Sequence, residues 1–90
     1  MEAGTKVACL KRLSRVEGQI RGVAKMIEAD RYCIEVITQL QAAKAALLRV
    51  EEQILKDHVS HCVAHAMKSG DARDQQTKID ELMAVMARAR

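Results

Sequence analysis

The chain has 90 residues, which is one domain at most, and a chain this short buries only roughly 60–65% of its unfolded surface. It has no Trp, Phe or Pro and a single Tyr, so its composition excludes a large aromatic core and favours long helices that pack on other helices. The net charge of +3 is small, but six basic and two acidic residues between Thr5 and Glu28 give that segment +4, which predicts a polyanionic partner.

The first predicted helix covers residues 5–28, with Thr5 as its N-cap. Its apolar residues recur at steps of three and four and form one stripe, made of Leu10, Leu13, Val16, Ile20, Val23 and Ile27. Gly18 and Gly22 each cost a helix roughly 0.5–1 kcal/mol relative to Ala. We therefore expect the backbone of another molecule or element to approach these glycines closely.

The second predicted helix covers residues 31–67, with Asp30 as its N-cap and no interruption after Cys33. Its apolar residues follow the alternating steps of a heptad seam, namely Val36, Leu40, Ala43, Leu47, Val50 and Ile54. At about 1.5 Å per residue such a helix is about 50 Å long, so it cannot bury itself within this chain and needs a partner. Gly70 is the expected stop, and a third helix is predicted over residues 72–88. The predicted fold is an all-α oligomer, with residues 1–90 as one domain.

No run of about 18 apolar residues exists, and the first residues lack the apolar core of a signal peptide. We therefore expect a cytoplasmic protein without a membrane segment. In that compartment three cysteines indicate metal binding or redox chemistry before structural disulfides. All three histidines and one of the cysteines lie in the stretch Asp57–His65.

His58 and Cys62 stand four residues apart, so on a helix they share one face and can share one metal ion. Cys33 lies 25 residues before His58 (33 to 58), about 37 Å along a continuous helix, and cannot join them within one subunit. If two copies of the helix pair antiparallel, Cys33 of one copy comes opposite residues 58–62 of the other. The copies then cross within residues 41–48, where the side chains are smallest. A symmetric dimer would hold two equivalent sites, about one metal ion per subunit.

Two thiolates and one imidazole form a soft, three-coordinate set that suits Cu(I), whereas zinc would need a fourth ligand from His61 or water. A simpler interpretation also stays open at this point, in which the cysteines pack as small apolar residues. His61 and His65 are expected to be solvated surface residues. Cys9 has no evident partner.

Three stretches carry a resemblance to a known family: Leu-Lys-Arg-Leu-Ser-Arg-Val-Glu-Gly-Gln-Ile-Arg-Gly (10–22), Asp-Arg-Tyr-Cys (30–33) and Asp-His-Val-Ser-His-Cys-Val (57–63). The span from Leu10 to about Met86 resembles the CsoR/RcnR family of bacterial metal-responsive repressors, in its copper-sensing branch. The resemblance implies an antiparallel helical dimer that assembles into a dimer-of-dimers tetramer without a helix-turn-helix. It also implies that the apo protein binds double-stranded operator DNA and that Cu(I), bound between subunits, releases it. The residues implied as ligands are Cys33, His58 and Cys62, with Tyr32 and Glu81 around them.

Other members of the family set the alternatives. Nickel and cobalt sensors resemble this chain but carry an additional N-terminal histidine, and here no histidine precedes His58. Formaldehyde-responsive members usually lack the second cysteine, which is present here as Cys62. Persulfide sensors keep both cysteines but lack the histidine, so His58 weighs against them. A persulfide sensor using Cys33 and Cys62, or a nickel or zinc sensor, remains the alternative.

Functions outside this family have less support in the sequence. An enzyme is not expected, because no Cys-x-x-Cys is present and no base and nucleophile are arranged outside this one cluster. A copper store or chaperone is the non-DNA alternative, and it predicts copper binding without operator affinity. Two features depart from the family pattern: Cys9 is an extra thiol, and the linker over residues 71–77 is longer than usual, which affects the placement of Glu81.

The predicted DNA contacts come from polar side chains on neighbouring turns of the first helix, joined by one on the second. They are Lys11, Arg12, Arg15, Gln19 and Arg49. These side chains could approach phosphates or base edges. Charge alone also fits an ordinary solvated helix face, and it is the family resemblance that favours DNA. Without aromatic platforms, recognition of single strands is not expected.

Overall fold

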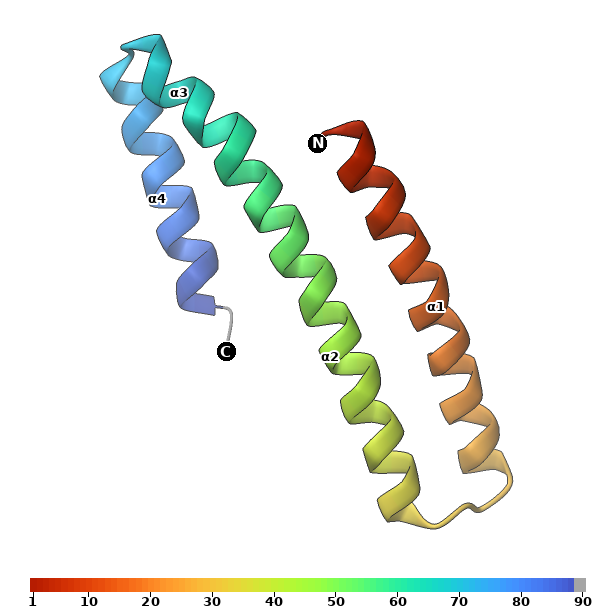
Figure 1. Ribbon diagram of the computed structural model, residues 1–90. Helices are drawn as coiled ribbons and strands as arrows, with labels where there is room; N and C mark the ends of the chain where they lie inside the picture. The colour runs from red at the N-terminus through yellow and green to blue at the C-terminus, as the bar shows by residue number, and fades with distance from the viewer. Residues whose placement is uncertain (89–90) are drawn as a thin grey trace. The chain divides into compact units, whose positions relative to one another are not determined.

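The computed structural model describes residues 1–88, which form helices joined by short turns, without a strand (Figure 1). In chain order the elements are α1 (Ala3–Glu28), α2 (Cys33–His58), the π-helical turn η1 (Val59–Val63), α3 (Ala64–Ser69) and α4 (Ala72–Arg88). The all-α prediction is confirmed. The first helix begins two residues earlier than predicted, with Glu2 rather than Thr5 at its N-cap. The second predicted helix, at 31–67, is divided into α2, η1 and α3.

The chain divides into two compact units, Met1–Leu55 and a second that begins at Lys56. The first contains α1 and most of α2. The second contains the last turn of α2 together with η1, α3 and α4. A single domain over residues 1–90 stays a prediction.

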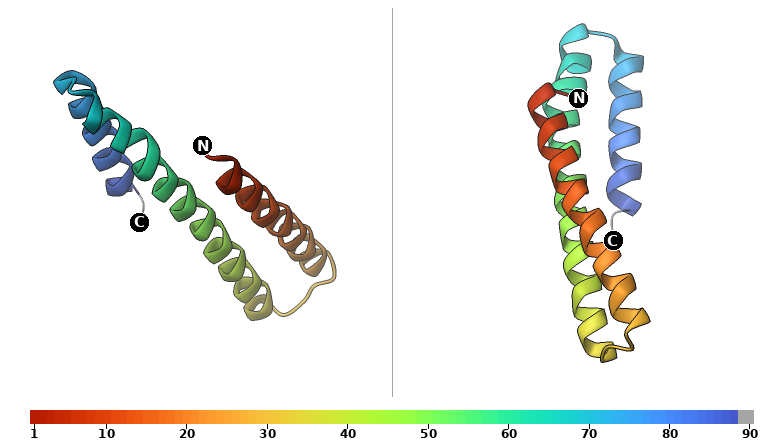
Figure 2. Two further views of the ribbon diagram at one scale, coloured as in Figure 1. Left: turned by 45° about the horizontal axis from the view of Figure 1, so that its top comes forward. Right: turned by 90° about the vertical axis from the view of Figure 1, so that its right-hand side faces the viewer.

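In the first unit, α1 and α2 form an antiparallel hairpin, and the two helices lie side by side in every view (Figures 1 and 2). The buried residues of both helices are spaced by seven. They are Cys9, Val16 and Val23 on α1 and Ala43 and Val50 on α2, each at most 5% exposed. A seven-residue repeat keeps one narrow stripe of a helix against its neighbour. The hairpin core is therefore a short coiled-coil-like seam of small and β-branched side chains.

Only part of the predicted heptad seam of α2 enters this core. Ala43 and Val50 are buried, whereas Leu40 and Leu47 are 43% exposed and Ile54 is 36% exposed. Each of these exposed residues lies three or four positions from a buried one, so the exposed residues form an adjacent face of the helix. The predicted seam therefore consists of two adjacent faces of α2, and only the face with Ala43 and Val50 is buried in the hairpin. On α1 the predicted stripe divides in the same way and leaves three of its residues more than half exposed, namely Leu10, Ile20 and Ile27.

Helix α1 ends in a Schellman motif centred on Asp30. The backbone N–H of Arg31 donates to the carbonyl of Met26 at 3.0 Å, and the N–H of Asp30 donates to the carbonyl of Ile27 at 3.1 Å. Asp30 has a φ of 52°, in the left-handed region where Gly is the usual residue and Asp is tolerated. Asp30 therefore terminates α1.

Helix α2 begins at Cys33, and Tyr32 is the residue that starts it. The carbonyl of Tyr32 accepts hydrogen bonds from the backbone N–H groups of Glu35 (2.9 Å) and Val36 (3.2 Å). The prediction of Asp30 as the N-cap of the second helix is wrong, because the left-handed backbone at that residue belongs to the end of α1.

In the second unit, the turn between α3 and α4 follows the predicted stop and restart. Gly70 is the C-cap of α3 with a φ of 75°. The Oδ1 atom of Asp71 accepts hydrogen bonds from the backbone N–H groups two and three residues further on, at 3.0 and 3.2 Å. The side-chain amide of Gln75 donates to the carbonyl of Met67 at 3.2 Å and ties the first turn of α4 to α3. Helix α4 contacts both α3 and η1.

Large apolar side chains remain exposed along each of the long helices of the single chain. Monomeric soluble proteins rarely expose contiguous apolar patches of more than a few hundred Å². Within the part of the chain that the structure describes, no helix has both the length and the apolar character that crossing a membrane requires.

Candidate metal site and basic surface

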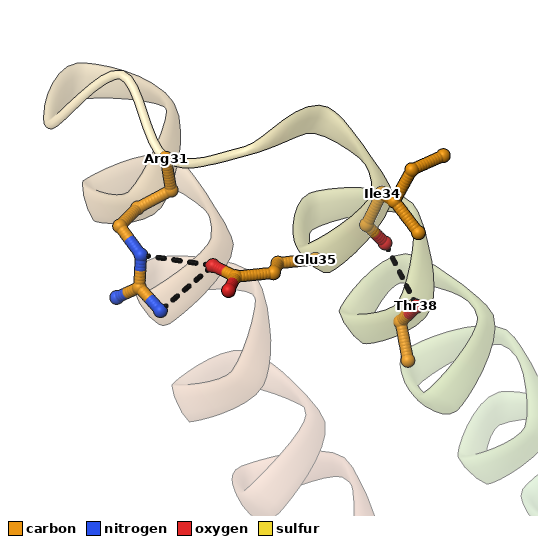
Figure 3. Close-up of polar contacts among 4 residues, drawn as sticks. All are labelled: Arg31, Ile34, Glu35 and Thr38. Carbon is orange, nitrogen blue, oxygen red and sulfur yellow. Dashed lines mark hydrogen bonds and ion pairs between the residues drawn. The ribbon is translucent and has the colours of Figure 1, made fainter.

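Cys33 is an exposed free thiol and the first residue of α2. The guanidinium of Arg31 contacts the carboxylate of Glu35 one turn into the helix, at 2.9 and 3.0 Å, and the hydroxyl of Thr38 donates to the carbonyl of Ile34 at 2.8 Å (Figure 3). Cys33 is thus a surface thiol at a well-defined helix start.

His58 is the last residue of α2, and Cys62 lies in the π-helical turn that follows. His58 is partly buried, and Cys62 is an exposed free thiol. The pair therefore occupies adjacent turns in the second unit, and its sharing of one metal ion stays a prediction. The predicted uninterrupted helix is wrong at this point, because Val59–Val63 has the i→i+5 bonding of a π-helix. Such turns are rare and frequently occur at functional sites.

Asp57 is a charged residue that the structure buries and that sequence reasoning missed. Its carboxylate Oδ1 lies 3.8 Å from Nε2 of His61, and the side chains are 5% and 55% exposed. This contact reaches from the last turn of α2 into η1. The four-residue spacing of an acid and a histidine was the sequence signal that could have indicated it.

Helical spacing places both ends of α2 on one face. Steps of seven, seven, seven and four residues lead from Cys33 through Leu40, Leu47 and Ile54 to His58, and all of these steps keep a residue on the same side of a helix. We call these five residues the open face of α2, because its three apolar members are exposed. A helix of 26 residues is about 38 Å long. One chain therefore cannot bring Cys33 and His58 to the same ion.

Of the two residues expected around the ligands, Tyr32 is exposed next to Cys33, and Glu81 is exposed on α4. Their part in a metal site stays a prediction. Cys9 is buried at 4% exposure in the α1–α2 seam, where it packs as a small apolar residue.

The four polar residues predicted to contact DNA are exposed on one side of α1, and we call them the basic face: Lys11, Arg12, Arg15 and Gln19. The acidic residues of α1 lie on another side. One of them, Glu17, is 4.0 Å from Arg21, and both side chains are well exposed. Arg49 is exposed on α2. Positive charge without neighbouring carboxylates suits contact with phosphates, and the DNA contacts of these residues stay a prediction.

Gly18 and Gly22 lie on the same side of α1 as Lys11 and Arg15. A Cβ atom at Gly22 would meet nothing within 4 Å, and one at Gly18 would meet only the guanidinium of Arg21 at 4.0 Å. Within residues 1–88, which the structure describes, no neighbouring atom therefore requires glycine at either position.

Residues 5–88 match the family model described as metal-sensitive transcriptional repressor. The copper-sensing transcriptional repressor RicR of Mycobacterium tuberculosis is 49% identical over 78 residues, which are 87% of this chain and 80% of the relative. The copper-sensing transcriptional repressor CsoR of Bacillus subtilis is 47% identical over 74 residues, 82% of this chain and 70% of the relative. The chain belongs to the metal-sensitive transcriptional repressor family.

Solved structures agree with this assignment. The copper-sensing repressor CsoR with Cu(I) from Geobacillus thermodenitrificans superposes with a TM-score of 0.87 at 41% identity, over 97% of this chain and 88% of that one. The nickel-responsive transcriptional regulator InrS superposes with a TM-score of 0.77 at 37% identity, over 92% and 90%. The resemblance inferred from the three sequence stretches is confirmed. So is the interpretation of this repressor as a metal-responsive regulator rather than an enzyme.

Proposed function

We propose that this repressor senses copper(I). The apo protein binds double-stranded operator DNA, and it is released when Cys33 of one subunit and His58 and Cys62 of another hold Cu(I) between them. The observation that carries the proposal is the open face of α2, which has a candidate ligand at each end and exposed apolar residues between. The copper-sensing names of the similar repressors support the choice of metal.

The open face accounts for both the dimer and the ligand set. An antiparallel copy of α2 laid across it would cover Leu40 and Leu47 and bring each Cys33 opposite His58 of the other subunit. Two-fold symmetry then generates two identical sites, about one Cu(I) per subunit. The exposed apolar residues of α1 leave a further surface for pairing of dimers into a homotetramer.

The donor chemistry fits Cu(I). Two thiolates and one imidazole are soft ligands, and three of them suit this ion. Cys33 and Cys62 are exposed free thiols, so both are accessible to a metal or to a second subunit. A tetrahedral zinc site would need a fourth ligand. The candidates for that ligand are His61 and water.

The basic face of α1 is the proposed DNA surface. Its side chains are exposed, and repetition over the subunits of a dimer or tetramer multiplies them into a broad positive surface. Arg49 adds a positive charge from α2. A repressor of this kind acts where the bacterial chromosome lies, in the cytoplasm.

Release of the DNA by copper follows from thermodynamic linkage between the two ligands of the protein, Cu(I) and the operator. If Cu(I) binding lowers the affinity for the operator by some factor, operator binding lowers the affinity for Cu(I) by the same factor, typically about 5- to 150-fold. The subunits therefore distribute between a DNA-binding arrangement and a copper-binding arrangement, and each ligand draws the population toward its own.

The test is an anaerobic titration of chelator-buffered Cu(I) into repressor bound to a labelled duplex, selected from random sequences by the apo protein and followed by fluorescence anisotropy. The dissociation constant of DNA should rise about 5- to 150-fold at copper saturation. His58→Ala should keep apo DNA binding and lose the copper response, whereas the control His65→Ala should keep both. An unchanged DNA affinity at copper saturation overturns the proposal. If polysulfide releases the His58→Ala variant from DNA, the protein is a persulfide sensor. If the protein binds copper but has no affinity for DNA, it is a copper store.

A second test addresses the sharing of the site between subunits. Cys33→Ala and a His58→Ala, Cys62→Ala double variant should each lose tight copper binding. Unfolded together and refolded, they form mixed dimers with one complete site, so copper binding should return at about one ion per four subunits. No recovery in a mixture shown by mass spectrometry to contain mixed dimers contradicts a shared site.

A further inference from the structure

Helix α4 has two exposed methionines beside its packed side. Leu82 and Val85 are partly buried, and with Lys78 they form a stripe at steps of three and four residues that faces the rest of the second unit. Met83 and Met86 each follow one of these packed residues directly, yet they are 65% and 57% exposed. Packing within the second unit therefore does not account for methionine at these two positions.

Met83 and Met86 stand three residues apart, so their side chains are neighbours on the helix, with Cβ atoms about 5–6 Å apart. Both lie in the last two turns of α4, which ends at Arg88. A methionine side chain is unbranched and flexible, so each can turn its sulfur atom toward the other. The two thioethers can therefore hold one ion together.

The charges near this pair favour a cation. The C-terminal end of a helix carries a partial negative charge. Asp80 precedes Met83 by three residues, on the neighbouring turn, and its carboxylate accepts a hydrogen bond from the side-chain amide of Gln76 at 2.8 Å. Arg88, the basic residue of the last turn, lies about 200° around the helix from Met86, since each residue turns the helix by about 100°. The helix therefore turns a carboxylate toward the pair and a guanidinium away from it.

The chemistry of the pair fits Cu(I). Thioether sulfur is a soft ligand, which suits this ion better than ions that prefer oxygen. A thioether carries neither a charge nor a proton, so two of them bind Cu(I) more weakly than a set with two thiolates and release it more readily. Helix α4 contacts η1, the turn that contains Cys62. An ion on these thioethers is therefore held on the helix that packs beside a candidate sensing ligand.

We propose that Met83 and Met86 form a second Cu(I) site, which takes the ion from a small thiol complex and passes it to His58 and Cys62. The inference rests on the copper-sensing function proposed above and adds the route by which the ion arrives. In the transfer, bonds from copper to the thioethers are replaced by bonds to thiolates and an imidazole. The thiol protons go to solvent, and copper stays in the +1 state. Because the thioethers leave the ion at the end, they change the rate of copper binding and not its equilibrium.

The site itself is tested in a full-length variant in which all three candidate sensing ligands are replaced by Ala. Its methionines carry ¹³C-labelled methyl groups, and Cu(I) is added anaerobically. The methyl resonances of Met83 and Met86 should shift, whereas those of Met26 on α1 and Met67 on α3 should not. Unshifted resonances at Met83 and Met86, or equal shifts at all methionines, overturn the inference.

The transfer is tested by stopped-flow mixing of the repressor with the Cu(I) complex of glutathione. A Met83→Leu, Met86→Leu double variant keeps two apolar side chains and removes both sulfur atoms. It should take up copper about tenfold or more slowly, because the ion loses its high local concentration beside the sensing ligands. Its Cu(I) affinity and its release from DNA at copper saturation should match the wild type. The control Met67→Leu should keep the wild-type rate.

Uptake by the double variant at the wild-type rate overturns the inference. The equilibrium titration of the wild type with DNA reports separately on the function. If copper does not release wild-type protein from DNA, the copper-sensing proposal fails, whereas the methyl shifts still decide whether the thioethers bind Cu(I).

Discussion

Leu47 lies in the middle of the open face of α2, and Leu47→Ala should weaken the dimer. Full burial of a leucine side chain is worth about 1.5–3 kcal/mol. Leu47 is 43% exposed in the single chain, so covering that remainder contributes about 0.6–1.3 kcal/mol per subunit. A symmetric dimer contains the residue twice, and its dissociation constant should rise about 10- to 80-fold.

Sedimentation equilibrium of the apo protein over a range of concentrations measures this dissociation constant. If the free subunit unfolds, the concentration dependence of the thermal unfolding midpoint reports the same loss. The control is Met83→Ala, which truncates an apolar side chain of α4 that is 65% exposed and lies outside the open face. The reasoning is refuted if Leu47→Ala leaves dimerisation unchanged, or if Met83→Ala weakens it equally.

Three further substitutions test other parts of the account. Arg15→Ala should weaken binding to all duplexes and reduce the slope of log K against log salt concentration by about 1. The control Arg21→Ala, beside Glu17 on another side of α1, should change neither quantity. Equal slopes for the two variants would show that Arg15 does not belong to the DNA surface. Gly22→Ala should raise the free energy of unfolding by roughly 0.5–1 kcal/mol, because Ala favours the helix. It should also raise the dissociation constant of the operator if DNA approaches this glycine closely. Stabilisation with unchanged DNA binding would show that no DNA approaches it. Asp30→Gly should raise the free energy of unfolding in urea by about 1 kcal/mol, because it relieves a left-handed residue; a loss of stability contradicts that reasoning.

The helical fold was predictable because its signals are local. Apolar residues at steps of three and four indicate the long helices, and Gly70 followed by Asp71 marks the end of one and the start of the next. The sequence does not distinguish the two possible roles of Asp30, because Asp is common both at N-caps and in left-handed turns. The left-handed φ of 52° that decides between these roles is visible only in the structure.

The division of the α2 seam between two faces was not predictable from periodicity. Leu40 and Ala43 are both apolar and one turn apart, and only packing against α1 distinguishes the buried one. The π turn at Val59–Val63 has no Gly or Pro to signal it. By contrast, the spacing of Cys33, His58 and Cys62 by itself predicts that the three candidate ligands come from two different subunits, because the length of the helix separates them.

The most direct test of the central claim is the Cu(I) affinity of the repressor measured by competition with a chelator, once free and once saturated with operator DNA. Linkage predicts that the operator weakens Cu(I) binding by the same factor by which copper weakens DNA binding. Equal Cu(I) affinities with and without DNA would contradict a copper-responsive repressor.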